Sequence, residues 1–152
     1  MKQTLFAATA ALLSAMMAAS ALAQDSGGGK KPLDAVNAAE KGQLQNPFKD
    51  DKAAAEAGHK LYMSAGCNGC HGGTGGGGMG PPLTNAIWIY GKDEDTLYRL
   101  ITLGSQELQA KGYTRKGSES VKGPMPPFKD IVKSDEDLWK IVTWITSLSA
   151  GK

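Results

Sequence analysis

The sequence is short of cysteine, of histidine and of net charge, and each shortage excludes a class of function. Its 152 residues include 2 cysteines and 2 histidines, and the formal net charge is only +2. A structural zinc site usually takes four ligands arranged as two close pairs, and the chain has a single close pair of cysteines. Because nucleic-acid binding calls for a strong basic excess, we expect no nucleic acid among the partners.

Long hydrophobic runs are missing outside the N-terminus. Lys2 provides a basic start, the residues from Leu5 to Leu22 are mostly Ala, Leu and Met, and Ala21-Leu22-Ala23 resembles a cleavage site. These are the features of a secretory signal peptide. An uncleaved membrane anchor is the alternative, but polar residues interrupt the run and small residues end it. We therefore expect residues 1–23 to be removed and the mature chain to have no stable membrane insertion.

The two cysteines form one motif with a histidine, Cys67-Asn68-Gly69-Cys70-His71. This is the attachment signature of a c-type haem, in which each thiol adds to one vinyl group and the histidine ligates the iron. A redox-active pair is expected in a thioredoxin-like context, which is not evident, and a disulfide closing so small a loop would stabilise little. The motif therefore predicts one covalent haem c with its iron. Because c-type haem is attached outside the bacterial cytoplasm, it also predicts a periplasmic protein.

The mature chain begins with a stretch that has few large apolar residues. Residues 24–46 include a glycine run, so we expect a flexible leader with one helical turn over about residues 33–40. The packed domain is expected over residues 47–152. A small domain of this kind gains much of its core from a buried prosthetic group.

Helical periodicity dominates that domain, and no stretch is convincing as a strand. Three helices are predicted: one from Asp50-Asp51 into the cysteine motif, one from Asp93 to Gly104, and one from Ser134. Gly58 lies inside the first helix, where close approach of another helix would explain it. Residues 105–124 are polar and rich in turn formers, so we expect a long loop. The predicted fold class is all-α.

Taken in order, these features resemble a class I cytochrome c over about residues 47–150. The resemblance includes the following: a first helix with Gly58 and Tyr62, the cysteine motif, a Gly80-Pro81-Pro82-Leu83 turn, a middle helix, a Met125-Pro126 loop and an aromatic-bearing last helix. In one respect the chain departs from the family. Tyr62 stands five residues before Cys67 instead of the usual four, which predicts a bulge at the end of the first helix.

The resemblance implies roles for further residues. The Pro81 carbonyl is expected to accept a hydrogen bond from His71, and His71 and Met125 are expected to be the two iron ligands. Met125 lies 54 residues after His71 in a Pro-Met-Pro frame; the alternative is a methionine that merely fills a gap. Trp88 and Tyr90 are expected to donate to the haem propionates or, as an equal alternative, to pack in the core. His59, the other histidine, is expected to be solvated.

Two stretches of sequence resemble particular groups within this family. Gly-Met-Gly-Pro-Pro-Leu followed by Trp88-x-Tyr90-Gly91 is similar to bacterial periplasmic cytochromes, some of which accept electrons from quinoprotein alcohol dehydrogenases. The Trp88-x-Tyr90-Gly91 stretch is also similar to the c-type domains of cbb3 oxidase subunits. The resemblance implies a soluble electron carrier rather than an enzyme, with redox proteins as partners: a dehydrogenase as donor and a terminal oxidase as acceptor. The alternatives are a haem-bearing subunit of a larger respiratory or dehydrogenase complex, and an enzyme or sensor with an open haem site.

Overall fold

The computed structural model describes residues 29–149, so the predicted signal peptide lies outside the described residues. Over that range the chain forms helices and no strand, which confirms the all-α prediction. The helices are α1 (Pro32–Ala38), α2 (Lys52–Ser64), α3 (Asn68–His71), α4 (Glu94–Ala110) and α5 (Asp135–Leu148). Among the described residues, every helix is too short or too polar to cross a membrane.

The three long helices begin where their capping residues predict. Asp51, Asp93 and Ser134 each accept a hydrogen bond from the backbone N–H three residues later, at 3.0, 2.9 and 3.1 Å. Each bond satisfies one of the N–H groups that the first turn of a helix leaves without a partner. These starting points are therefore set by local chemistry.

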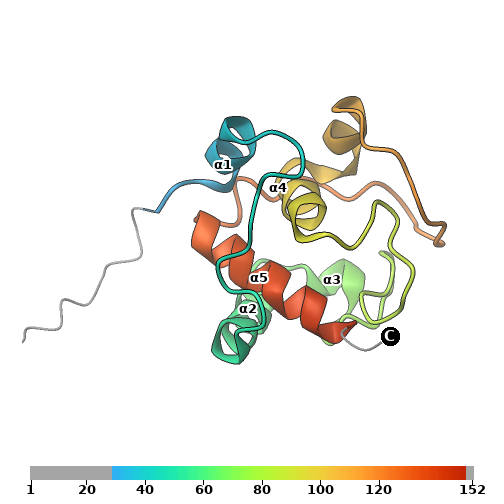
Figure 1. Cartoon of the computed structure of the whole chain (residues 1–152). Coiled ribbons are helices and arrows are strands. Elements are labelled where there is room, and N and C mark those ends of the chain that lie inside the picture. The colour runs from blue at the N-terminus through green and yellow to red at the C-terminus, as the bar shows by residue number, and fades with distance from the viewer. Residues whose placement is uncertain (1–28, 150–152) are drawn as a thin grey trace, which may run out of the picture.

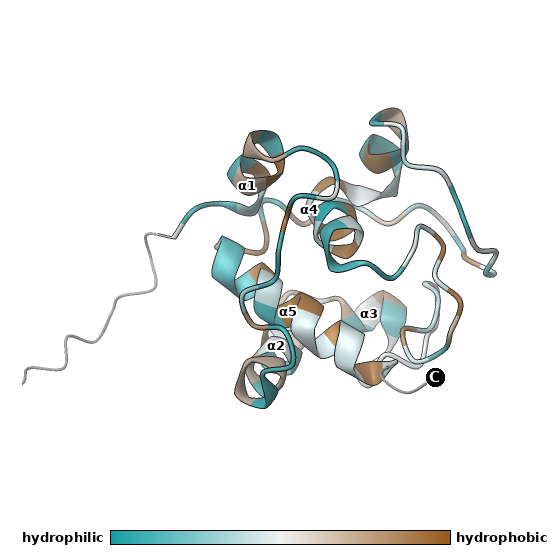
Figure 2. Ribbon diagram, viewed as in Figure 1, coloured by the Kyte–Doolittle hydropathy of each residue, from teal (hydrophilic) through white to brown (hydrophobic). Residues whose placement is uncertain are grey.

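The packing of α2 against α5 is the central contact of the fold, and Figure 1 shows the two helices side by side. Gly58 permits it, because a Cβ atom there would lie 1.9 Å from the carbonyl oxygen of Lys140. The predicted close approach at Gly58 is confirmed. In Figure 2 the first turn of α5 is hydrophilic and its later turns carry the hydrophobic residues. These include Leu138, Ile141 and Val142, which are at most 1 % exposed.

The end of α2 is a glycine cap and not the predicted bulge. Gly66 has a φ of +80°, and its N–H donates to the Met63 carbonyl at 3.2 Å. The N–H of Cys67 donates to the Tyr62 carbonyl, also at 3.2 Å. This pair of bonds is the Schellman pattern of helix ends. The extra residue between Tyr62 and Cys67 is taken up in that turn, and Cys67 follows it directly.

The middle helix is longer than the sequence indicates. Gly104 interrupts it as expected, with a φ of +74°, but helical turns resume and continue to Ala110. The predicted loop over residues 105–124 is therefore wrong for its first six residues. They include Gln, Glu, Leu and Ala, which are strong helix formers, so a new helical segment starts once the glycine has changed the chain direction.

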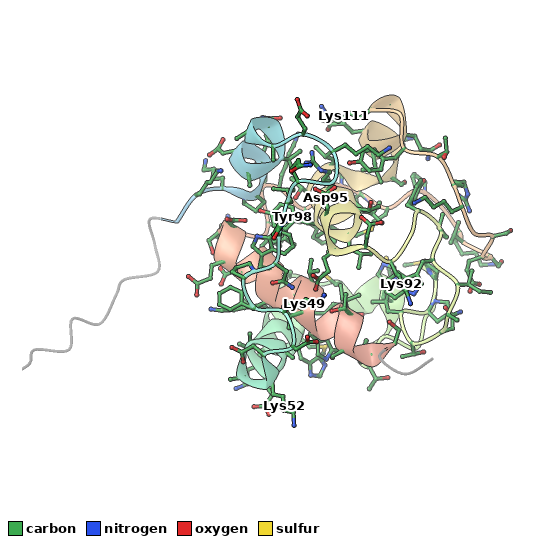
Figure 3. The ribbon with its side chains drawn as sticks, viewed as in Figure 1. Lys49, Lys52, Lys92, Asp95, Tyr98 and Lys111 are labelled. Carbon is green, nitrogen blue, oxygen red and sulfur yellow. The ribbon has the colours of Figure 1, made fainter. Side chains whose placement is uncertain are left out.

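The expected flexible leader is corrected for residues 29–46, which pack on α4. Arg99 donates to the carbonyls of Val36, Ala39 and Glu40, at 3.2, 3.0 and 2.6 Å. Asp95, which is labelled in Figure 3, accepts from two backbone N–H groups of the chain between α1 and α2, each at 3.0 Å. Asp95 and Arg99 also pair with each other at 3.0 Å. A buried ion pair requires such partners, and the backbone of residues 29–46 supplies them.

Candidate functional site

The cysteine motif lies on the single turn of α3, directly after the cap of α2. The N–H groups of Cys70 and His71 both donate to the Cys67 carbonyl, at 3.2 and 3.0 Å. Cys67 is buried, Cys70 is half-buried, and neither forms a disulfide. Burial raises the pKa of the Cys67 thiol to about 11. In the protein without its prosthetic group, Cys67 is therefore a neutral thiol at physiological pH.

The ring of His71 lies against the backbone of the loop at Gly80 and Pro81. Its Nδ1 lies 2.8 Å from the carbonyl oxygen of Pro81, which is the contact that the resemblance implies. Because a carbonyl only accepts, Nδ1 carries a hydrogen, and in the neutral imidazole Nε2 is then the nitrogen with the free lone pair. A Cβ atom at Gly80 would lie 2.9 Å from Cε1 of the ring, so only glycine lets the loop pass this close. The imidazole is therefore prepared as a ligand through Nε2.

Two cavities meet at this histidine, one of about 450 Å³ and one of about 240 Å³. Both are lined by Cys67, His71, Pro81 and Met125. The walls of the larger cavity come mainly from apolar residues of α4, α5 and the chain between α3 and α4. The fold thus brings Met125 and His71 to the same space. An apolar space of this size between a histidine and a methionine fits a flat, largely apolar group such as haem.

Trp88 and Tyr90 both line the larger cavity. Trp88 Nε1 is buried and finds no acceptor among the described residues. The Tyr90 hydroxyl accepts from Gln109 Nε2 at 2.7 Å, which leaves its own hydrogen to donate. Buried donors of this kind are normally paired. Two donors beside a largely apolar space fit a group that carries acceptor oxygens at one edge, as the haem propionates do.

His59 lies outside both cavities, and its environment differs from the expected solvation. Its ring stacks on Trp144 at a centroid distance of 4.6 Å, and Nε2 lies 2.9 Å from the Gly73 carbonyl oxygen. Tyr62 donates to the neighbouring Gly72 carbonyl at 2.6 Å, and burial raises the pKa of Tyr62 to about 12. Both side chains therefore form hydrogen bonds with the backbone of the glycine-rich loop that follows the cysteine motif.

Sequence reasoning missed two residues that touch the predicted site residues. Ser105 bonds both backbone polar groups of Met125, and Gln109 donates to Tyr90. Both lie on the last turns of α4, which the sequence indicates as loop. The signal available in the sequence was the helix-forming composition after Gly104.

Comparison with known proteins agrees with this geometry. The sequence model of the family described as Cytochrome c matches residues 55–149. No curated protein sequence gives a match. Among solved structures, the chain is similar to cytochrome cL from the marine methylotrophic bacterium Methylophaga aminisulfidivorans, with a TM-score of 0.51 and 20 % identity over 82 % of this chain and 70 % of that one. At this identity the likeness concerns the fold.

The family match spans more than half of the chain and includes the cysteine motif. The arrangement of helices and the fit of the cavities agree with it. The chain therefore belongs to the cytochrome c family, as a class I c-type cytochrome that binds haem c covalently and carries electrons.

Proposed function

We propose that this protein is a soluble periplasmic carrier that receives electrons from a dehydrogenase and passes them towards a terminal oxidase. The observation that supports this most is the presence of both His71 and Met125 on the walls of the two cavities. If His71 and Met125 both ligated the iron, no coordination position would be left for a substrate. Bound haem supplies one-electron chemistry, because its iron is stable as ferric and ferrous.

In this proposal each residue of the motif has a defined role. Cys67 and Cys70 would form the thioethers, and His71 would ligate through Nε2 while the Pro81 carbonyl accepts its Nδ1 hydrogen. That hydrogen bond fixes the ring orientation and increases the basicity of the imidazole. Met125 would be the second ligand, and its thioether would favour the ferrous state and raise the reduction potential.

The side chains around the larger cavity orient the prosthetic group. Trp88 Nε1 is buried without an acceptor in the part of the chain that the structure describes, and Tyr90 has a hydrogen left to donate, so both would be placed to donate to the propionates. Such bonds satisfy the buried donors and hold the charged edge of the group in place.

The proposals for the electron donor and for the cellular location rest on the sequence. The stretch from Met79 to Gly91 resembles cytochromes that accept electrons from quinoprotein alcohol dehydrogenases, so we propose a dehydrogenase of that class as donor. Residues 1–23 are proposed to be a signal peptide that directs the chain to the periplasm. A haem-bearing subunit of a larger complex is distinguished from a free carrier by the intact mass and association state of the purified protein.

The ligand assignment is tested with Met125→Ala in the ferric holoprotein. Loss of a sulfur–iron bond should abolish the weak near-infrared absorption and lower the reduction potential. Met63→Ala is the matched control, since Met63 is 42 % exposed and lines neither cavity. An unchanged near-infrared spectrum in Met125→Ala would assign the sulfur ligand to another methionine, whereas absence of this absorption from the wild-type protein would favour an open-site protein.

The donor is tested by mixing the ferric holoprotein with a quinoprotein alcohol dehydrogenase and its alcohol. We expect rapid appearance of the ferrous spectrum, dependent on both the enzyme and the alcohol. Reduction that is no faster than without the enzyme would contradict the proposed donor and leave the role of electron carrier in place.

A further inference from the structure

The segment that carries Met125 has very few backbone N–H groups that could donate a hydrogen bond. Residues 124, 126 and 127 are proline, so Met125 has the only backbone N–H between Gly123 and Phe128. That N–H donates to the Ser105 hydroxyl at 3.0 Å. The single side chain of Ser105 therefore takes the one hydrogen bond that the Pro-Met-Pro-Pro segment can donate.

The same residue also holds the other polar group of Met125. The backbone N–H of Ser105 donates to the Met125 carbonyl at 2.9 Å. Ser105 and Met125 are thus joined by two hydrogen bonds that close a ring. Ser105 is only 7 % exposed, so water competes little for its hydroxyl.

These bonds exist because α4 is broken at Gly104. In an unbroken helix the N–H of Ser105 would donate to the Ile101 carbonyl, four residues earlier. Here the Ile101 carbonyl accepts from Phe128 N–H at 2.9 Å, and the Ser105 N–H turns to Met125. Both groups of this broken helical pair therefore bond to residues 125–128 instead.

Gly104 also makes room for this segment. Its φ is +74°, and a Cβ atom there would lie 2.8 Å from both the Met125 carbonyl oxygen and the Pro127 nitrogen. The contacted atoms are backbone, which cannot rotate away. The backbone at Gly104 and the backbone of residues 125–127 are therefore in close contact.

From this geometry we propose that Ser105 is a positioning residue for Met125: the break in α4 presents its hydroxyl and N–H so that the methionine is held towards the prosthetic group. This inference rests on the proposed function, in which Met125 is the second iron ligand. Without the hydroxyl, the Met125 N–H loses its partner and the methionine should be displaced more easily by a competing ligand.

The experiment is a titration of the ferric holoprotein with imidazole, followed by loss of the near-infrared absorption. Imidazole has to displace methionine to bind, so its apparent affinity reports how firmly the methionine is held. In Ser105→Ala we expect about tenfold tighter apparent binding than in the wild type, which corresponds to about 1.4 kcal/mol. Before imidazole is added, the absorption should still be present.

Two control variants separate positioning from simpler effects. Thr102→Val removes a buried hydroxyl from the same helix, one that donates to the Tyr98 carbonyl at 2.9 Å. Gln106→Ala enlarges the same cavity, which Gln106 lines together with Ser105. Neither change removes a hydrogen bond of Met125, so both variants should bind imidazole as the wild type does.

The outcomes distinguish this inference from the proposed function. If Met125→Ala keeps the near-infrared absorption, the proposed ligand is wrong and the inference falls with it. If Met125→Ala loses the absorption but Ser105→Ala binds imidazole with wild-type affinity, Met125 remains the ligand and Ser105 has no positioning role. An equal gain in affinity in Thr102→Val or Gln106→Ala would overturn the inference too, because the effect would then be general.

Discussion

Replacing Gly58 by alanine tests the contact between α2 and α5 on which the core depends. A Cβ atom at this position would lie 1.9 Å from the Lys140 carbonyl oxygen and 2.5 Å from the Lys140 carbonyl carbon. Both atoms belong to the backbone of α5, so no change of rotamer relieves the overlap. The two helices have to move apart, and the buried side chains between them lose part of their packing.

Two opposing effects determine the size of the change. Helix propensity alone predicts that alanine stabilises the helix by about 1 kcal/mol relative to glycine. Overpacking costs roughly 1–3 kcal/mol and occasionally more, and an overlap with backbone belongs at the upper end. We therefore expect the free energy of unfolding to fall by about 2 kcal/mol. For a domain of this size that is a fall in Tm of roughly 6–10 °C.

The measurement is thermal unfolding of the holoprotein, followed by far-ultraviolet circular dichroism. A matched pair at the exposed Lys60 of the same helix, Lys60→Ala and Lys60→Gly, measures the propensity effect without a packing change. In that pair the alanine variant should be the more stable. If Gly58→Ala also raised the Tm, the close approach of α2 and α5 at Gly58 would be refuted.

Two further predictions concern the leader and the surface. Arg99→Met leaves the buried Asp95 carboxylate without its cation, so the free energy of unfolding measured with denaturant should fall by roughly 3–5 kcal/mol. Residues 29–46 should also become more accessible to protease. Protease resistance equal to that of the wild type would contradict this prediction. Arg115 borders the larger cavity, and reversing its charge together with that of Lys116 should slow electron transfer to the partner at low salt without changing the haem spectrum. If the double variant and the wild type transferred electrons at identical rates across ionic strengths, the loop that carries Arg115 and Lys116 would be excluded as the docking surface.

Features that depend on near neighbours were predictable from the sequence. The helix starts at Asp51, Asp93 and Ser134 each depend on a hydrogen bond that spans three residues. The Cys67–His71 motif is equally local, since its spacing reflects the chemistry of one prosthetic group. The family resemblance then implied the contact between His71 and Pro81, which the structure contains.

Features that depend on the path of the chain were not predictable in this way. The Asp95–Arg99 pair meets backbone groups more than fifty residues away, and a glycine-rich leader has no pattern that identifies these partners. Composition therefore indicated a flexible segment where the tertiary structure has a packed one.

The sequence by itself determined the helical class, the starts of the long helices and the haem-attachment motif, because each depends on residues within about one helical turn. Only the tertiary structure decided that α4 resumes after Gly104 and that Ser105 holds Met125, 20 residues later. The physical reason is that a break in a helix leaves backbone N–H and carbonyl groups without helical partners, here among them the N–H of Ser105 and the carbonyl of Ile101. Which distant segment satisfies them depends on where the folded chain returns, and here it returns at residues 125–128.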